Sequence, residues 1–427
     1  MTEFESHQRM SKQTHSQPLV VDEEGKSKIL EHMAIIYPKY RPPRGLKKEK
    51  PDWDLIAIEI RNILRDGSLN GHSGVGYPYS CKWSNIQHWI DNDPIEIVLL
   101  VMRRLYNLMY TDIEDDVDGK DLYEAGCVDF IRMFIKEELH SERKIVNKVP
   151  RLIKSPSLVD KIVAIYLYYN KDKQEIRNWR TIPSKPGLDF TDSGFEDIRS
   201  YHNLMRMKGK TADSDMSNWD YTVGKPLLDV ATEFRLMQMQ GKTKLVEKLF
   251  WNFEKCGLVA LYVTSDGFIC ERIQGAQDSG KQDTSSTNSF TRAFQSFCIA
   301  YLNQIPLDEH MCLTAGDDCG ENSYDNSAEM YKRMGHSVKL WRDTDIDGGL
   351  HFCSRFYPND PSEPVTFEGC AKTIGNLIMC DEIDVGMIRS RLSELRNNPY
   401  ERNLLIQYLK LNREDCYAWI HQWEGLV

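Results

Sequence analysis

The sequence has no long apolar run, no C-x-x-C pair and no internal repeat. Its longest apolar stretches, 98–102 and 162–169, are far shorter than the roughly 18 residues that a membrane-spanning helix needs. The eleven cysteines are odd in number, scattered, and lack histidines at zinc-finger spacing, which favours reduced thiols in a reducing compartment. Residues 1–17 are polar and contain no apolar signal core. These absences argue against a membrane-spanning, disulfide-stabilised or zinc-finger protein.

The composition that is present is that of an ordinary soluble protein, with 427 residues, 41% hydrophobic and 28% charged. This length suffices for two or three domains, or for one large multi-lobed domain with an ample core. The formal net charge of −10 argues against a surface that binds nucleic acid over its whole extent. A local basic channel is still compatible with that charge.

The most informative stretch is 311–321, MCLTAGDDCGE. Apolar residues lead into Gly316-Asp317-Asp318, and Gly320 follows, a pattern that predicts a strand, a tight turn and a return strand. Such a turn places two adjacent carboxylates at a hairpin tip, where they repel each other unless a cation or a proton lies between them. A hard divalent metal ion is one such cation. A solvated turn is the alternative that this motif leaves open on its own.

A second acidic centre lies in 209–224, GKTADSDMSNWDYTVG. Four residues separate Asp215 from Asp220, with a turn signal at Ser217-Asn218. One carboxylate could therefore end a strand while the other follows the bend and faces the same cavity. Asp213 lies in the same stretch, so charge alone does not fix the register. A polar turn with solvated acids is the alternative.

Residues 278–297, DSGKQDTSSTNSFTRAFQSF, combine a Ser-Gly turn, a run of small hydroxyl residues and a helix with apolar positions. Ser279, Thr284 and Asn288 offer hydrogen-bond donors and acceptors of the kind that a sugar hydroxyl needs. Small side chains also let a ligand approach closely. The alternative is a set of hydroxyl groups that cap the helix.

Two further segments could contact phosphate. Residues 143–154 carry five positive charges and no acid in a chain that is acidic overall. Such side chains neutralise a triphosphate and assist the departure of pyrophosphate, and a solvated basic hairpin is the alternative. The glycine-rich loop 71–80 carries Tyr77, Pro78 and Tyr79. Its amides and aromatic rings could guide a phosphate backbone, or the segment could be an irregular loop.

Apolar periodicity and turn residues predict the other elements. Helices are expected at 95–110 (with Asp93 as cap and Pro94 first), 158–169, 227–250 (one or two), 326–335 and 381–427, and strands at 258–270 (a hairpin), 336–341 and 351–357.

Residues 1–50 have the composition of a weakly ordered arm, for which a solvated linker is favoured over an RNA contact. The acidic patch 112–118 has calcium-loop spacing in part, but Ala125 stands where the closing glutamate belongs, which favours a solvated face.

The order and content of these segments resemble the polymerase motifs of positive-strand RNA virus RNA-dependent RNA polymerases, above all those of the sobemovirus, polerovirus and barnavirus lineage. The matching stretches are S-G-V-G-Y-P-Y (73–79), K-E-E-L-H-S-E-R-K through R-L-I (136–153), D-M-S-N-W-D (215–220), S-G-K-Q-D-T-S-S-T-N (279–288), G-D-D (316–318), a stretch ending in Lys339, and F-C-S-R (352–355). Each motif alone is weak, whereas the whole series in the expected order is specific.

The resemblance implies an α+β right-hand polymerase fold with fingers, a palm built on antiparallel sheet and a small helical thumb. The implied domains are an N-terminal arm (1–50), fingers (51–208, with the template-channel loop 71–80 and the basic nucleotide-channel motif 136–154), a first palm part (209–233), a fingers insertion (234–275), a second palm part (276–357) and the thumb (358–427). Only 72 residues follow Arg355, which agrees with a small thumb.

The resemblance also implies template-directed RNA synthesis from ribonucleoside triphosphates by two-metal-ion nucleotidyl transfer, in the replication of a viral positive-strand RNA genome. The implied roles are metal binding and catalysis by Asp215, Asp317 and Asp318, general acid catalysis by Lys339, nucleotide binding by Lys136, Lys144, Arg151, Asp220, Ser279, Thr284 and Asn288, and RNA binding by Ser73, Gly76, Tyr77, Ser354 and Arg355. The implied cofactor is a pair of Mg²⁺ ions, for which Mn²⁺ can substitute. For Lys339 the spacing is loose, and a surface lysine is the alternative.

The implied partners are template and product RNA and ribonucleoside triphosphates, with a viral protein primer and other replication proteins as further candidates. The expected location is the host-cell cytoplasm, in membrane-associated replication complexes that the chain reaches through partners. A reverse transcriptase shares the palm metals, but Gly316 before the aspartates, and Asp220 with Asn288, favour ribonucleotides. A non-enzymatic acidic metal-binding protein would leave the basic run and the hydroxyl-rich segment unexplained.

Overall fold

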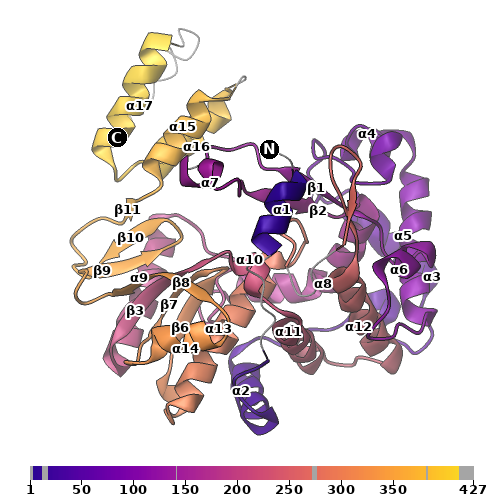
Figure 1. The fold of residues 1–427 in the computed structure, drawn as a ribbon, viewed down its shortest axis with the longest axis horizontal. Coiled ribbons are helices and arrows are strands. Elements are labelled where there is room, and N and C mark those ends of the chain that lie inside the picture. Colours follow the sequence, from indigo (N-terminus) through magenta and orange to yellow (C-terminus); the bar gives the residue numbers. More distant parts are fainter. Residues whose placement is uncertain (1–2, 12–17, 141, 272–276, 381–382, 413–427) are drawn as a thin grey trace.

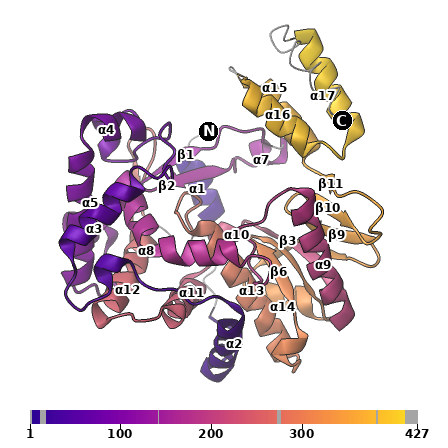
Figure 2. The same ribbon diagram turned by 180° about the vertical axis from the view of Figure 1, so that it is seen from behind.

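The protein has a mixed α+β structure with three small sheets (Figures 1 and 2). The computed structural model describes residues 3–11, 18–140, 142–271, 277–380 and 383–412. In these residues the strands are β1 (Ile131–Ile135), β2 (Leu152–Ser155), β3 (Thr211–Ser217), β4 (Tyr262–Val263), β5 (Ile269–Cys270), β6 (Cys312–Ala315), β7 (Asp318–Asn322), β8 (Ser337–Asp343), β9 (Gly349–Phe352), β10 (Arg355–Pro358) and β11 (Thr366–Phe367). The α+β class that the sequence predicted is confirmed.

The central sheet has the strand order β6-β7-β3-β8, and every neighbouring pair is antiparallel. Successive residues of a strand point to opposite faces, so Cys312 and Leu313 of β6 enter different cores. Cys312 packs in the core that includes α11 (Lys225–Gln238), α13 (Thr284–Leu302) and α14 (Ser327–Arg333). Leu313 packs with α9 (Asp192–Lys208) and β9. The sheet is therefore covered on both faces, and its strand ends carry the polar site.

A helical region occupies the other half of the molecule and holds the sheet of order β2-β1-β4-β5 (Figure 1). Its helices are α3 (Trp53–Ile63), α4 (Ile86–Asn92), α5 (Pro94–Tyr110), α6 (Gly119–Glu124), α8 (Leu158–Arg177) and α12 (Lys244–Val259). The short helix α7 (Glu142–Val146) lies outside this region, toward the C-terminal helices (Figures 1 and 2). As predicted, Asp93 caps α5 by accepting the backbone N–H of Glu96, and Pro94 begins the helix. None of the helices in the described ranges is long and apolar enough to cross a membrane.

The C-terminal helices stand apart from the central sheet in both views (Figures 1 and 2). They are α15 (Cys370–Ile378), α16 (Val385–Glu394) and α17 (Pro399–Asn412). Leu377, Leu392 and Leu405, one from each helix, belong to a separate small core. The sheet of order β11-β10-β9 connects these helices to the rest. Helical structure expected over 381–427 is confirmed for 385–394 and 399–412, and residues 381–382 and 413–427 lie outside the described ranges.

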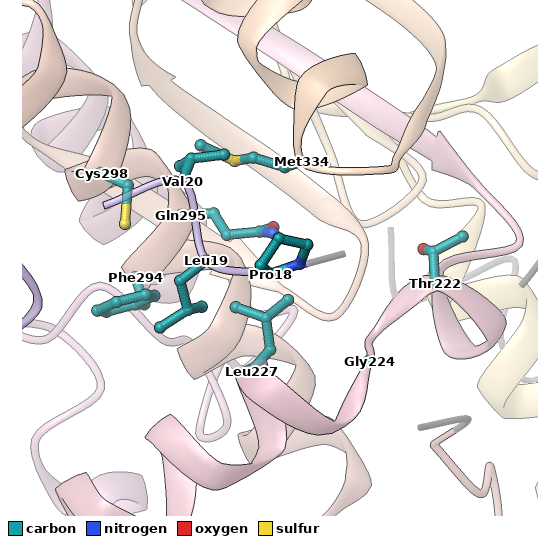
Figure 3. A pocket seen from close by; sticks show the side chains of 10 residues that line it. All are labelled: Pro18, Leu19, Val20, Thr222, Gly224, Leu227, Phe294, Gln295, Cys298 and Met334. Carbon is teal, nitrogen blue, oxygen red and sulfur yellow. The ribbon is translucent and has the colours of Figure 1, made fainter. Parts of the chain in front are cut away.

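The expectation of a weakly ordered arm over 1–50 was wrong for its described residues. They include α1 (Glu3–Ser11) and α2 (Glu23–Ile36), and Asp22 caps α2 by accepting the N–H of Gly25 at 2.8 Å. The segment 18–20 lies against α11 and α13 around a cavity of about 20 Å³ (Figure 3). That volume holds about one water molecule, so the cavity is too small for a substrate.

Of two further predictions, one is confirmed and one is wrong. The stretch 227–250, predicted as one or two helices, forms two, α11 and α12, with a turn at Gly241, whose φ is +70°. The single strand expected at 351–357 is instead a hairpin of β9 and β10. Its turn residues, Cys353 and Ser354, have φ values of +52° and +56°. Glycine and asparagine are the residues usually found in such a turn, so the sequence did not predict one here.

Three buried histidines around the central sheet, His202, His310 and His336, are expected to weaken the fold in acid. Their ring nitrogens bond hydroxyl and amide groups. Burial lowers the pKa of His202 to about 4 and the pKa of both His310 and His336 to about 3. Between those values and 6.5 the unfolded chain binds protons that the folded chain does not bind. The free energy of unfolding should therefore fall below pH 6.5, by up to about 1.4 kcal/mol per pH unit for each histidine.

Denaturant unfolding measured from pH 5 to pH 7.5 tests this expectation. A His310→Gln variant should show a shallower pH dependence than the wild type, because glutamine has no proton to gain. Equal slopes for the two proteins would contradict the assignment of a neutral His310.

Candidate active site

The predicted hairpin at the Gly-Asp-Asp motif is confirmed. β6 and β7 pair antiparallel, with Ala315 opposite Asp318. Gly316 has a φ of +71°, in the left-handed region that glycine adopts without a steric penalty. Its N–H donates to the Ser289 Oγ of α13 at 2.9 Å. The turn is thus fixed against α13, and Asp317 and Asp318 follow it directly.

Asp215 lies near the end of β3, the strand between β7 and β8. Its carboxylate forms an ion pair with Lys339 of β8. Asp213 is buried and is already engaged by the Arg342 Nε at 2.7 Å and by the backbone N–H of His351 at 3.0 Å. The register that the sequence left open is therefore resolved: Asp215, and not Asp213, is the carboxylate of β3 beside the turn.

The two aspartates of the turn have raised pKa values. For Asp317 the causes are reduced hydration among the surrounding protein atoms and then repulsion from Asp215. For Asp318 the causes are reduced hydration and then repulsion from Asp317 and Asp215. The pKa of Asp318 rises to about 7, although a backbone hydrogen bond from Cys353 and the positive charge of Lys339 oppose the rise. Solvent still reaches the Asp317 side chain, which is exposed. Three carboxylates thus share one site and repel one another.

This donor set fits a hard divalent cation. Such ions prefer carboxylate oxygens, and Mg²⁺ is usually bound through one or two carboxylates together with water and phosphate oxygens. Positive charge would relieve the repulsion among Asp215, Asp317 and Asp318, and Lys339 already supplies one positive charge at Asp215. Across the described residues, no three His, Cys, Asp or Glu side chains are arranged to hold an ion by themselves.

Asp220 is brought to the same site by a bend after β3. Asn218, with φ +52°, makes the bend into α10 (Trp219–Thr222), which carries Asp220. The Asn288 Nδ2 donates to the Asp220 Oδ1 at 2.9 Å. Burial raises the pKa of Asp220, against the opposing effects of Asn288, Lys154 and Arg151. The Asn288 Oδ1 is buried and has no hydrogen-bond partner within the described residues, so a donor is missing there.

The other two predicted sugar-binding hydroxyls hold their own loop in this structure. Thr284 donates to the carbonyl oxygens of Asp278 and Lys281, the latter at 2.9 Å. The Ser279 Oγ accepts the N–H of Lys154 at 3.4 Å. Thr284 thus holds the loop before α13 and Ser279 joins that loop to β2, while no side-chain capping bond forms among the described residues at the start of α13, and nucleotide binding by both residues stays a prediction.

The basic segment lies close to the carboxylates. Burial raises the pKa of both Asp317 and Asp220, and the positive charge of Arg151 opposes that rise. The Glu138 carboxylate pairs with the Lys136 Nζ at 2.9 Å and lies 3.7 Å from the Arg151 Nη1. Lys144 is exposed on α7. Reduced hydration and then Arg151 lower the pKa of Lys144, so these positive groups act on one another.

The glycine-rich loop 71–80 packs on the junction between β2 and α8. Gly76 has a φ of +74°, and a Cβ there would lie 2.8 Å from the Ser157 Cα. Only glycine fits this close approach. Tyr77 stacks on Phe130 with ring centroids 5.6 Å apart. The carbonyl oxygen of Ser73 accepts the N–H of Ile86 at 3.0 Å. The loop is ordered by these contacts, and RNA binding by Ser73, Gly76 and Tyr77 stays a prediction.

Arg355 lies in different surroundings from those expected of an RNA-binding residue. It is 4% exposed, and its guanidinium carbon lies 3.7 Å from the ring centroid of Phe190 and 5.0 Å from that of Phe367. The Arg355 Nη1 also donates to the carbonyl oxygen of Cys353 at 3.2 Å. Arg355 therefore supports the turn at Ser354 from inside the protein and, in this structure, presents no charge for RNA.

Three residues at the site were missed by sequence reasoning. Ser289 holds the Gly316 turn, and Glu138 holds two of the predicted triphosphate-binding cations. Arg292 of α13 is fully buried, 4.0 Å from the ring centroid of Tyr331, and contacts Glu321 at 3.5 Å. The helix face of Arg292 is shared with Asn288, Ser289, Gln295 and Ser296, so nothing in the sequence indicated that Arg292 is buried. Glu138 stands inside a matched motif and Ser289 directly follows one, but neither has a distinguishing pattern of its own.

Comparison with known proteins agrees with this geometry. A family model described as viral RNA-directed RNA polymerase matches residues 87–202 and 255–354. These ranges include the basic segment, the hydroxyl-rich segment, the Gly-Asp-Asp turn and Lys339. The chain belongs to the viral RNA-directed RNA polymerase family.

Similar proteins come from the virus groups that the motifs indicated. The chain is 29% identical over 335 residues to the replicase polyprotein P2AB of Southern bean mosaic virus, which covers 76% of this chain and 34% of that protein. It is 30% identical over 334 residues to protein P1-P2 of a potato leafroll virus, covering 73% and 29%. It is 29% identical over 305 residues to the RNA-directed RNA polymerase of mushroom bacilliform virus, covering 70% and 72%. The matched region thus spans about a third of the two plant-virus proteins.

Proposed function

We propose that this protein synthesises RNA on an RNA template from ribonucleoside triphosphates, by two-metal-ion nucleotidyl transfer, in the replication of a positive-strand viral genome. The observation that carries the proposal is the convergence of Asp215, Asp317 and Asp318 on one site of the central sheet. A cluster of mutually repelling carboxylates beside basic side chains is suited to binding metal ions and a triphosphate together.

In the proposed right-hand arrangement, the central sheet with 209–233 and 276–357 is the palm. The helical region with 51–208 and 234–275 forms the fingers, and 358–427 forms the thumb. The separate core of α15, α16 and α17 supports a small helical thumb. The N-terminal 50 residues then add two packed helices to this body.

Asp215, Asp317 and Asp318 would hold the metal ions. A pair of Mg²⁺ ions, or Mn²⁺ in their place, would supply charge stabilisation for the attacking 3′-hydroxyl and the departing pyrophosphate. The carboxylates stand at or near the ends of rigid strands, next to a turn that the Gly316 backbone and the hydroxyl of Ser289 hold in place. Such rigidity matters because reacting atoms must be aligned within a fraction of an ångström.

Arg151, Lys136 and Lys144 are proposed to bind the triphosphate. A triphosphate is a stronger partner for these cations than the single carboxylate of Glu138, which now holds Lys136 and Arg151. Asp220 and Asn288 are proposed to recognise the ribose 2′-hydroxyl. The unpartnered Asn288 Oδ1 supports this role, since it could accept a hydrogen bond from that hydroxyl.

Lys339 is proposed as the general acid that protonates the departing pyrophosphate. Its ion pair with Asp215 places its ammonium group at the carboxylate site. A Lys339→Met variant should lose about 10² in kcat, with a smaller change in KM, because a proton donor acts in the chemical step. Steady-state incorporation at saturating Mg²⁺ measures this. Lys332→Met, at an exposed lysine of α14, is the control, and a Lys339 variant within twofold of wild type would remove the proposed role.

The function is tested by incorporation of labelled ribonucleotide on primed and unprimed short RNA templates, with and without Mg²⁺. Mg²⁺-dependent, template-directed products would support the proposal, and the two templates would separate primed from unprimed initiation. A reverse transcriptase would instead extend with deoxyribonucleotides. A purely structural metal protein would be stabilised by the ion but would form no product. Replication proteins, a protein primer and membrane-associated complexes in the host cytoplasm belong to the same proposal as partners and location.

A further inference from the structure

The loop 278–283, which leads into α13, is fixed by a buried network of charged side chains that have no role above. Asp283 precedes α13, and its side chain is fully buried. Its carboxylate forms an ion pair with Arg235 of α11 and accepts a hydrogen bond from the Thr287 Oγ1 at 3.0 Å. Arg235 also donates to that same Thr287 hydroxyl. One guanidinium group therefore fixes both the end of the loop and the first turn of the helix.

The network reaches a second point of the loop through Glu254 of α12. The Glu254 carboxylate lies 3.4 Å from the Arg235 Nη1 and 2.6 Å from the Lys281 Nζ. It also accepts the hydroxyl of Tyr168. Burial opposes the charge on Arg235, but Asp283, Tyr168 and Glu254 outweigh it and raise the pKa, so the group stays charged. A planar guanidinium with several acceptors is a rigid connector.

A third contact fixes the middle of the loop. The N–H of Gly280 donates to the carbonyl oxygen of Lys154 at 3.0 Å. A Cβ at Gly280 would lie 2.4 Å from that same oxygen, so only glycine allows this approach. The loop is thus attached at Gly280 to β2, at Lys281 to α12, and at Asp283 to α11.

We infer that Arg235, Glu254 and Lys281 are positioning residues for ribose selection, because they set the place of the α13 start and hence of Asn288 against Asp220. The inference deepens the proposed function and rests on it. The geometry gives the reason: the bond from Asn288 to Asp220 is 2.9 Å long, and a displacement of about 1 Å would break it. Misplacement on this scale can lower a rate by about 10² even when the altered residue is remote.

The test compares kcat/KM for a ribonucleotide and for its 2′-deoxy analogue on one primed RNA template. Lys281→Met removes one attachment at a partly exposed side chain, and Arg235→Lys keeps the charge but loses the planar fork. Both should lower the ribose-to-deoxyribose ratio by about tenfold, within the range for residues coupled in one network. The matched controls are Lys255→Met, at the next position of α12 but paired with Asp115, and Arg104→Met, at a buried arginine of α5.

A general loss of folded enzyme lowers both kcat/KM values equally and leaves their ratio unchanged. A lowered ratio in Lys281→Met and Arg235→Lys, with control ratios within twofold of wild type, supports the inference. Unchanged ratios, or equal losses in variants and controls, overturn it. If Arg235→Lys does not fold, Lys281→Met decides the matter. A wild type that uses both nucleotides equally would instead refute the proposed ribose site, which separates the two failures.

Discussion

An Asp317→Ala variant is expected to lose at least about 10³ in the rate of Mg²⁺-dependent ribonucleotide incorporation. Each 1.4 kcal/mol of lost transition-state stabilisation lowers a rate about tenfold, and a two-metal site supplies several kcal/mol. Asp317 is the exposed member of the three carboxylates, so alanine removes the proposed metal ligand without opening a core cavity. The loss should therefore appear in activity with little change in the unfolding midpoint.

Single-nucleotide extension under single-turnover conditions is the appropriate measurement, because it isolates the chemical step. Asp317→Asn keeps the shape and removes the charge, so it should resemble the alanine variant. Asp325→Ala, at a fully exposed aspartate beyond β7, is the control and should retain activity within twofold. Near-wild-type incorporation by Asp317→Ala would exclude Asp317 as a metal ligand and would remove the main support for the proposed mechanism.

The second large effect is expected in the choice between ribonucleotides and deoxyribonucleotides. A site built to bond a hydroxyl can reject the analogue that lacks it by up to about 10⁴ to 10⁵. Asp220→Ala removes the partner of Asn288 and should lower the wild-type ratio by about 10 to 100, since a lost buried hydrogen bond costs about 1–3 kcal/mol. Asn288→Ala should produce a comparable loss, and the double variant should add little because the two residues share one bond.

Competition between a ribonucleotide and its deoxy analogue in one reaction gives this ratio directly. Asp229→Ala, at an aspartate of α11 that pairs with Lys225, is the matched control. A ratio near one in the wild type, or an unchanged ratio in Asp220→Ala, would move 2′-hydroxyl recognition away from this pair.

Features that depend on short stretches of chain could be predicted from the sequence. The Gly-Asp-Asp hairpin follows from an apolar run that leads into a glycine turn, and α5 follows from its cap and its apolar period. The approach of Asp215 to this hairpin could not be derived in that way, because it depends on pairing between β3 and β7, about a hundred residues apart. The prediction that Asp215 shares a site with Asp317 and Asp318 came instead from the order of the motifs, which resembles that of the polymerase family.

The errors have physical causes of a similar kind. The polar residues of the N-terminal segment hid two helices whose stability comes from tertiary contacts, such as the bond from the Ser6 Oγ to the carbonyl oxygen of Pro150 at 3.0 Å. For Arg355 the family resemblance implied RNA binding, whereas the side chain is buried against the ring of Phe190, a packing that its motif does not reveal. The turn at Cys353 and Ser354 carries no glycine, so its left-handed backbone left no trace in the sequence.

The packing of α12 against α5 has a consequence for how the chain is made. The Asn252 side chain donates to the carbonyl oxygen of Leu108 at 2.8 Å, across 144 positions. The core of the helical region cannot close until both partners have left the ribosome. At about 5–20 residues per second, the part of α5 that α12 covers stays exposed for roughly 7–30 s, although α3 and α8 leave the ribosome earlier and cover other parts of α5. During that interval the nascent chain depends on chaperones or on transient local contacts to avoid aggregation.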